Sequence, residues 1–249
     1  MAGEKALVWD EVGKRTYTTG IDHVALYVQK DGKYPKGVAW NGFTGITENP
    51  SGADENAIYA DNIKYLSLRA AEEFGLTLEC LDTPVEFDEC DGCATPEGAN
   101  GLTVTQQTRR PFGLVYRNNL GSDTDGDSAG YELHLVYGCS ASPSDVSHST
   151  INASPEPGSL SYEITTVAVP VPGMKPSAHL VINSINADKD KLKALELVLF
   201  GGDDEPRLPM PEEVIQILSG KTAEGLSAGQ ADASTHVETA AKTVAKSAN

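Results

Sequence analysis

The stretch YELHLVY at residues 131–137 alternates apolar and polar side chains with a period of two. That period puts successive side chains on opposite faces of a β-strand, so such stretches predict strands, most of them with one wet face. The same alternation occurs at residues 23–28, 63–68 and 76–81. Four further apolar stretches predict strands: residues 101–107, 112–117, 159–169 and 177–183. Many short strands predict a mainly β fold, a β-sandwich or barrel with extended loops and arms.

Turn-forming residues separate these strands, at Asp31-Gly32, Asn118-Asn119 and residues 155–158. One long segment has a helical period instead, because residues 188–200 (DKDKLKALELVLF) space their leucines three and four apart and precede Gly201-Gly202. We expect one flanking α-helix there. Two short helical turns are predicted at 84–90 and 211–218, and the proline-punctuated strip 205–211 is expected to lie on the surface as an extended arm.

The charge of the chain is strongly negative, with 36 acidic and 19 basic residues and a net charge of −17. Residues 221–249 carry three acids and three bases, so the whole excess belongs to residues 1–220. Binding to nucleic acid requires clustered Lys and Arg, and the sequence has no such cluster. Any contact with DNA is therefore expected to be non-adhesive.

The composition divides the chain into three predicted parts: a β-sandwich domain at 1–202, a Pro-rich arm with a short helix at 203–220, and a flexible low-complexity tail at 221–249. Charged residues stand where a signal peptide needs an apolar run, and no stretch approaches the ~20 apolar residues of a membrane span. We therefore expect synthesis in a cytoplasm, free thiols and no membrane partner.

Two local patterns offer metal or redox chemistry. Cys90 and Cys93 have CxxC spacing, but a structural zinc site needs four ligands and no second pair completes it, so incidental cysteines are favoured over a metal or redox site. The stretch Asp123–Asp127 carries three alternating carboxylates, as a calcium loop does. The EF-hand pattern then fails at its sixth and twelfth positions, so a solvated hairpin turn is favoured over a cation site.

The five histidines form no recognisable catalytic pattern, and the chain has no GxSxG elbow, P-loop or GxGxxG. His134 and His179 lie in predicted strands, where we expect half-exposed positions. The sequence therefore predicts a protein that is not an enzyme, with no cofactor and no metal ion.

The most unusual local feature is a run of nine acids without a Lys or Arg: Glu72, Glu73, Glu79, Asp82, Glu86, Asp88, Glu89, Asp91 and Glu97. Such a run is either the solvated edge of an acidic protein or a surface that faces DNA without binding it.

The order of several motifs between about Lys5 and Gly220 resembles that of the major tail proteins of long-tailed bacteriophages with non-contractile tails. The motifs are KALVWDEVGKRTYTTGIDHVALY (5–27), GVAWNG (37–42), YADNIKY (59–65), AEEFG (71–75), QQTRR (106–110), FGLVYR (112–117), GYELHLVYG (130–138) and the helical stretch 192–202. The tail after Gly220 and the CxxC spacing match nothing in that family.

The resemblance implies a tail tube subunit of the virion: a β-sandwich with a flanking helix, six copies of which close into a ring. The rings stack into a hollow tube around a tape measure protein, between tail terminator and distal tail proteins, and loops and terminal arms bridge neighbours. Such a tube is assembled in the host cytoplasm and conducts double-stranded DNA during ejection. Its lumen is typically electronegative, so the nine acids are candidates for the lumen or its rim.

Two other classes of function remain open on the sequence alone. A monomeric carbohydrate-binding β-sandwich could use Trp9 and Trp40 as stacking platforms, although aromatic residues make up only 6% of the chain. A metal-dependent hydrolase could use Cys90, Cys93 and the loop 123–127.

Overall fold

The computed structural model describes residues 9–124, 126–148, 150 and 157–220. Its strands are β1 (Thr16–Val28), β2 (Gly37–Ala39), β3 (Phe43–Glu48), β4 (Ser51–Gly52), β5 (Glu55–Ala60), β6 (Ile63–Arg69), β7 (Glu72–Glu73), β8 (Gly75–Cys80), β9 (Phe112–Ser122), β10 (Gly126–Ala141), β11 (Leu160–Thr166) and β12 (His179–Asn183). Its helices are the 3-10 turn η1 (Val85–Phe87), α1 (Asp88–Asp91), α2 (Lys189–Phe200) and α3 (Pro211–Ser219).

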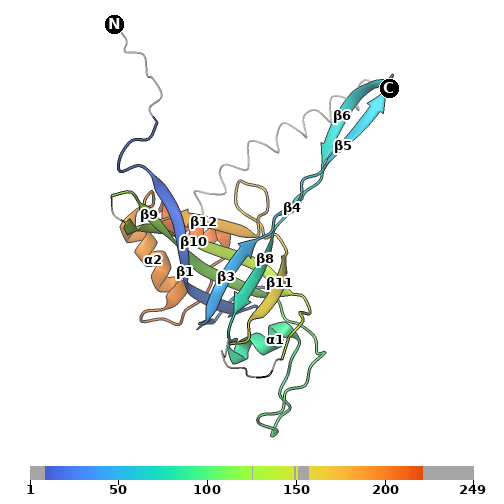
Figure 1. Cartoon of the computed structure of the whole chain (residues 1–249), viewed down its shortest axis with the longest axis vertical. Coiled ribbons are helices and arrows are strands. Elements are labelled where there is room, and N and C mark those ends of the chain that lie inside the picture. Colours follow the sequence, from blue (N-terminus) through green and yellow to red (C-terminus); the bar gives the residue numbers. More distant parts are fainter. Residues whose placement is uncertain (1–8, 125, 149, 151–156, 221–249) are drawn as a thin grey trace, which may run out of the picture.

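Eight strands form one antiparallel sheet in the order β2-β1-β9-β10-β11-β8-β3, with β12 paired to β10. The sheet folds over, so that β1, β9 and β10 face β3, β8 and β11 (Figure 1). Between the two halves lies a first core that includes Leu26, Leu78, Leu114 and Tyr162. The predicted mainly β, sandwich-like fold is confirmed.

A second core lies on the other side of β1, β9 and β10, beneath α2 and α3. Its members include Leu135 and Tyr137 from β10 and Leu195 and Leu199 from α2, all without exposed surface. Val136, between Leu135 and Tyr137, is buried in the first core. Residues 133–137 therefore lack the wet face that is expected of most of the alternating strands, because β10 is the middle layer of three and is covered on both sides.

Gly138 marks the point at which β10 changes partner. Residues 132–136 pair with β12, whereas residues 139–141 pair with β11, and the register shifts between Val136 and Cys139. Gly138 has a φ of +62°, and a Cβ atom built there would lie 2.4 Å from the carbonyl oxygen of Val167. Only glycine tolerates both conditions, so this residue allows one long strand to serve both halves of the sandwich.

The flanking helix forms as predicted. The carboxylate of Asp188 accepts hydrogen bonds from the backbone N–H groups of Asp190 (3.1 Å) and Lys191 (3.2 Å), which caps α2. The two short helical turns are also present, as η1 with α1 and as α3, whose first residue is Pro211.

Replacing Asp188 with Ala should lower the free energy of unfolding by about 1 kcal/mol, because two N–H groups lose their acceptor. Urea denaturation measures this change. Asp188→Asn keeps an acceptor oxygen and is expected to retain most of the stability. Equal losses in both variants would show that the cap does not stabilise α2.

Three local predictions are wrong. Residues 101–107 form no strand, only a bridge between Ala94 and Val104, because Leu102 is half-exposed and no second layer of described residues covers the segment. Asn118-Asn119 forms no turn but continues β9. The strip 205–211 is not an extended surface arm, since Leu208 is buried in the second core and pairs with Tyr34.

Three other predictions are not tested. The predicted turn at 155–158 lies largely outside the described residues, as does the predicted tail 221–249. The predicted division at residue 202 stays a prediction, although α3 packs against α2 and Arg207 binds Glu213 through two hydrogen bonds of 2.6 and 2.8 Å.

Candidate functional sites: an exposed arm, an acidic face and a histidine cluster

A long two-stranded arm leaves the sandwich between β3 and β8. The pair β4–β7 forms its stem and the pair β5–β6 its outer part, closed by a turn at Asp61 and Asn62 with φ values of +53° and +64°. Asparagine and aspartate tolerate the positive φ values that a tight hairpin turn requires. The arm projects from one end of the molecule, and α1 lies near the other end (Figure 1).

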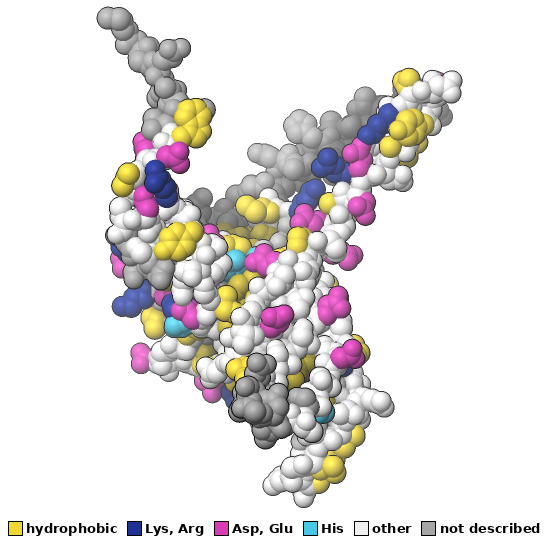
Figure 2. Space-filling view, viewed as in Figure 1, with side chains coloured by type: hydrophobic (Ala, Val, Ile, Leu, Met, Phe, Trp, Pro, Cys, Tyr) yellow, Lys and Arg dark blue, Asp and Glu magenta, His cyan; other side chains and the backbone are white. Residues whose placement is uncertain are grey.

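The outer arm exposes apolar side chains on a strand whose sequence predicts one buried face. Every residue of β6 is exposed, including Ile63 (62%), Tyr65 (67%) and Leu68 (54%), and Tyr59 of β5 is 69% exposed. Figure 2 shows hydrophobic side chains along this arm. The strand prediction is right, but nothing in the described part of the chain covers the face.

An isolated two-stranded hairpin is marginally stable in water, and its unpaired edges can bind another chain. Within this arm, Lys64 forms an ion pair with Glu55, whose carboxylate also accepts a hydrogen bond from the hydroxyl of Ser67 (2.5 Å). Such exposed pairs contribute little to stability. The arm therefore has few stabilising contacts among the described residues beyond the pairing of its own strands.

The nine acids run from the stem of the arm to the opposite end of the sandwich. Glu72 and Glu73 form β7, Glu79 lies in β8, and the others lie after β8, in and around η1 and α1. Arg109 binds Asp91 (2.9 Å) and Arg110 binds Glu89 (3.1 Å). The other seven acids form no ion pair with any described residue. Their place in a lumen or rim stays a prediction.

A polar sheet face accompanies this run. In β3, β8 and β11 the inward side chains fill the first core, and the alternate side chains point outward and are exposed or half-exposed. The register aligns Glu79 with Ser161, and Thr77 with Glu163 and Thr47. The outward residues of the three strands are small, polar or acidic and include no Lys or Arg: Gly45, Thr47, Gly75, Thr77, Glu79, Ser161, Glu163 and Thr165. Glu163 is not among the predicted site residues, because its partner strand cannot be read from sequence.

Near the first core lies a cluster of two histidines and a glutamate, in which His134 is buried, His179 is partly buried and Glu48 is exposed. His134 is 6% exposed, and its Nδ1 lies 3.0 Å from Nε2 of His179 and 3.4 Å from Oε1 of Glu48. The hydroxyl of Tyr116 donates a hydrogen bond of 2.8 Å to the same Oε1. Burial lowers the pKa of both imidazoles, that of His179 to about 4, so both rings are neutral at pH 7. The expected half-exposed position is wrong for His134.

The cysteines of the CxxC motif are free thiols. Burial, reinforced by the charge of Glu89, raises the pKa of Cys90 to about 12, and burial with the neighbouring Asp91 raises the pKa of Cys93. A protonated thiol is a poor nucleophile and a poor metal ligand. This environment favours the interpretation that these cysteines are incidental.

Asp123 and Thr124 lie in the turn between β9 and β10, as favoured, whereas Gly126 and Asp127 already belong to β10. The carboxylate of Asp123 accepts two hydrogen bonds from the backbone N–H of Gly13, at 2.9 and 3.1 Å. Asp125 lies outside the described residues. Asp123 therefore fastens the segment before β1 to this turn.

The two tryptophans have opposite environments. Trp9 is 74% exposed, whereas Trp40 is 2% exposed, packs against Phe43 and Phe87, and donates its indole N–H to the carbonyl oxygen of Asp82. Trp40 is therefore a core residue, and the idea that it forms a carbohydrate-stacking platform is wrong.

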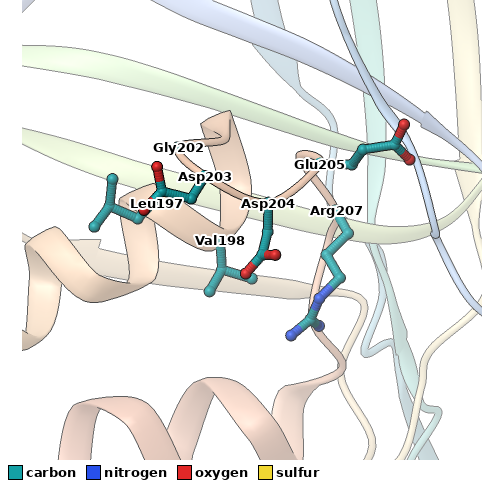
Figure 3. A pocket seen from close by; sticks show the side chains of 7 residues that line it. All are labelled: Leu197, Val198, Gly202, Asp203, Asp204, Glu205 and Arg207. Carbon is teal, nitrogen blue, oxygen red and sulfur yellow. The ribbon is translucent and has the colours of Figure 1, made fainter.

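A shallow cleft of about 340 Å³ lies between the end of α2 and the following loop (Figure 3). Its lining combines Leu197 and Val198 with Asp203, Asp204 and Arg207. The guanidinium of Arg207 is held by Glu213. The cleft therefore offers a mainly acidic rim and no free cationic group from its described lining.

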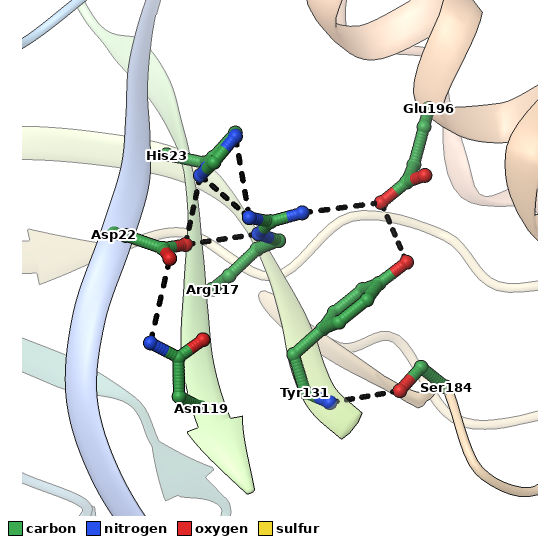
Figure 4. A network of polar contacts seen from close by, with 7 residues as sticks. All are labelled: Asp22, His23, Arg117, Asn119, Tyr131, Ser184 and Glu196. Atoms are coloured by element: carbon green, nitrogen blue, oxygen red, sulfur yellow. Dashed lines mark hydrogen bonds and ion pairs between the residues drawn. The ribbon is translucent and has the colours of Figure 1, made fainter. Parts of the chain in front are cut away.

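A polar network joins β1, β9, β10 and α2 around Arg117 (Figure 4). The guanidinium binds Asp22 (2.9 Å), lies 3.7 Å from Glu196 and stacks over the ring of Tyr131. Burial raises the pKa of Asp22, but the hydrogen bonds and charges of Arg117 and His23 together outweigh it and leave this pKa below its usual value. The network links the sheet to the helical layer.

Neither the protein-family models nor the curated proteins compared with this chain match it. The relation to phage tail proteins thus stays a resemblance carried by the order of motifs. No described helix is long and apolar enough to cross a membrane.

Proposed function

We propose that this chain is a non-enzymatic tail tube subunit of a bacteriophage virion, which assembles into stacked rings of six copies. The observation that carries the proposal is the arm, whose β6 exposes every residue despite its apolar sequence. A face that the sequence builds as buried and the single chain leaves bare needs a partner. In an assembly of identical subunits, another copy of the same chain is such a partner and is present at high local concentration.

The ends of the sheet support closure into a ring. The strand order ends at β2 and β3. Gly37 of β2 already donates its N–H to the carbonyl oxygen of Pro206, so the edge at β3 is the better candidate for pairing with another chain. Contact between unlike surfaces of identical subunits is head-to-tail, and such contacts close into rings or continue as open stacks. The arm, directed away from the sandwich, suits contact with a neighbouring copy or ring.

The acidic sheet face supports a role for DNA passage. We place the outward face of β3, β8 and β11 in the lumen, because it combines Glu79 and Glu163 with small polar residues and has no cationic side chain. Such a wall repels phosphate and does not retain a moving duplex. This assignment extends the predicted lumen from the nine acids to Glu163.

Reversing both charges with Glu79→Lys and Glu163→Lys should make assembled tubes retain short duplex DNA. Each new phosphate contact should make the slope of the logarithm of the DNA-binding constant against the logarithm of the salt concentration more negative by about 0.9. Fluorescent duplex retained by sedimented tubes measures the effect. The control is Glu205→Lys, on the helical side of the sandwich. If both proteins retain equal DNA, bulk charge explains the result and the lumen assignment is wrong.

The assembly itself is tested by light scattering of the purified full chain over a range of concentrations. We expect species of at least six times the 26.4 kDa chain mass. A carbohydrate-binding module would instead stay monomeric and bind a glycan array. With Trp40 buried, Trp9 is the tryptophan that such a module would still expose.

A further inference from the structure

The cluster of Glu48, His134 and His179 lies where the arm joins the sandwich. Glu48 is the last residue of β3, directly before the arm, and Phe74 directly precedes β8, where the arm returns. The ring of Phe74 stacks on His179 with centroids 4.3 Å apart, and Tyr116 stacks on His134 at 4.5 Å. The two imidazoles are therefore held in place by aromatic rings.

The three ligand atoms face one another at distances that suit one metal ion. They lie within 4.8 Å of one another, with His134 Nδ1 3.0 Å from His179 Nε2 and 3.4 Å from Glu48 Oε1. Two ligands bound tetrahedrally at about 2.0–2.1 Å are separated by about 3.3–3.4 Å. Small side-chain shifts would thus complete a three-ligand site, with a water as the fourth ligand.

We propose that Glu48, His134 and His179 bind one divalent transition-metal ion of the zinc class. Two imidazoles and a carboxylate are ligands that such ions accept, whereas Mg²⁺ and Ca²⁺ prefer oxygen ligands. The hydroxyl of Tyr116 orients the carboxylate through its hydrogen bond to Oε1. A bound ion would link β3 to β10 and β12, and so fix the direction in which the arm leaves the sandwich.

One feature of the cluster limits the affinity. When both facing nitrogens donate lone pairs to an ion, the N–H of His134 moves to its Nε2. That atom is buried and has no hydrogen-bond partner among the described residues. Metal-binding histidines usually donate this second N–H to an acceptor, so we expect weaker binding than in a site where every imidazole has such a partner.

The test is binding of Zn²⁺ to the tag-free full chain, measured by equilibrium dialysis with elemental analysis and by the rise in unfolding temperature. We expect one Zn²⁺ per chain, a visible spectrum of four-coordinate Co²⁺ when Co²⁺ replaces it, and no binding of Mg²⁺. His179→Ala should abolish binding. Glu48→Gln keeps the side-chain shape but removes the carboxylate ligand. Losing only the hydrogen-bond partner of a metal ligand weakens binding by roughly 10–100-fold, so losing the ligand itself should weaken it by at least that much.

Two matched variants identify the site. His148→Ala removes an exposed histidine outside the cluster, and Cys93→Ser removes the more accessible thiol of the CxxC motif. Both should bind Zn²⁺ as the unmodified chain does. No Zn²⁺ bound, or binding lost in Cys93→Ser and kept in Glu48→Gln, would overturn the proposal. Either result leaves the tube proposal standing, because the exposed arm and the acidic sheet face that support it are present without an ion.

Discussion

A chain in which Ile63 and Tyr65 are both replaced by Ser will fold but will not form tubes at concentrations at which the unmodified chain does. These side chains are 62% and 67% exposed, so their replacement changes the stability of the monomer little. In a contact they become buried, and each large apolar side chain then contributes about 1.5–3 kcal/mol. Losing two of them should raise the concentration needed for assembly by about 100-fold or more.

Sedimentation of polymer as a function of protein concentration measures this effect, with circular dichroism to verify the fold. The matched control replaces Val167 and Met174, which are 70% and 76% exposed on the sandwich, with Ser. We expect the control to assemble as the unmodified chain does. If the Ile63/Tyr65 variant assembles at the same protein concentration as the unmodified chain, the arm is not a contact element.

Gly138→Ala should destabilise the fold strongly for the addition of a single methyl group. The residue would have to keep a φ of +62°, and its Cβ would lie 2.4 Å from the carbonyl oxygen of Val167. The backbone cannot move aside easily, because Gly138 N–H donates to Tyr34 Oη and its carbonyl oxygen accepts from Val167 N–H. Backbone strain and overpacking together should cost about 2–4 kcal/mol.

Gly32→Ala separates the two contributions. Gly32 also has a positive φ, +75°, but nothing lies within 4 Å of the position that its Cβ would take, so only the backbone strain applies. The cost should then be about 1–2 kcal/mol. Chemical denaturation of both variants gives the difference. If Gly138→Ala lowers the free energy of unfolding by no more than Gly32→Ala does, the close packing around Gly138 does not add to the penalty for a side chain there.

The elements of the fold that depend on local sequence could be predicted. The helix at 188–200 follows from leucine spacing and its cap, and β8 follows from alternation at 76–81. Burial of both faces of β10 could not be predicted, because alternation indicates only that the two faces of a strand differ in polarity and not what covers each face. The environment of each face depends on α2 and β8, which come from distant parts of the chain and supply side chains to the two cores.

The candidate sites show the same limit. Alternation at 63–68 predicts the strand of the arm, but the exposure of that strand depends on whether another layer covers it. The histidine cluster joins β3, β10 and β12, so no spacing in the sequence indicates it. Trp40 could be taken for a binding residue because a lone tryptophan carries no sign of burial, yet Phe43 and Phe87 enclose it.

The tail tube proposal requires above all that this chain assembles with copies of itself into a hollow tube. Electron microscopy of the purified full chain, alone and with tail initiator components, tests it most directly. We predict rings or tubes with six subunits per turn and an open lumen. Particles of monomer size at every concentration, even with the initiator components present, would contradict the account.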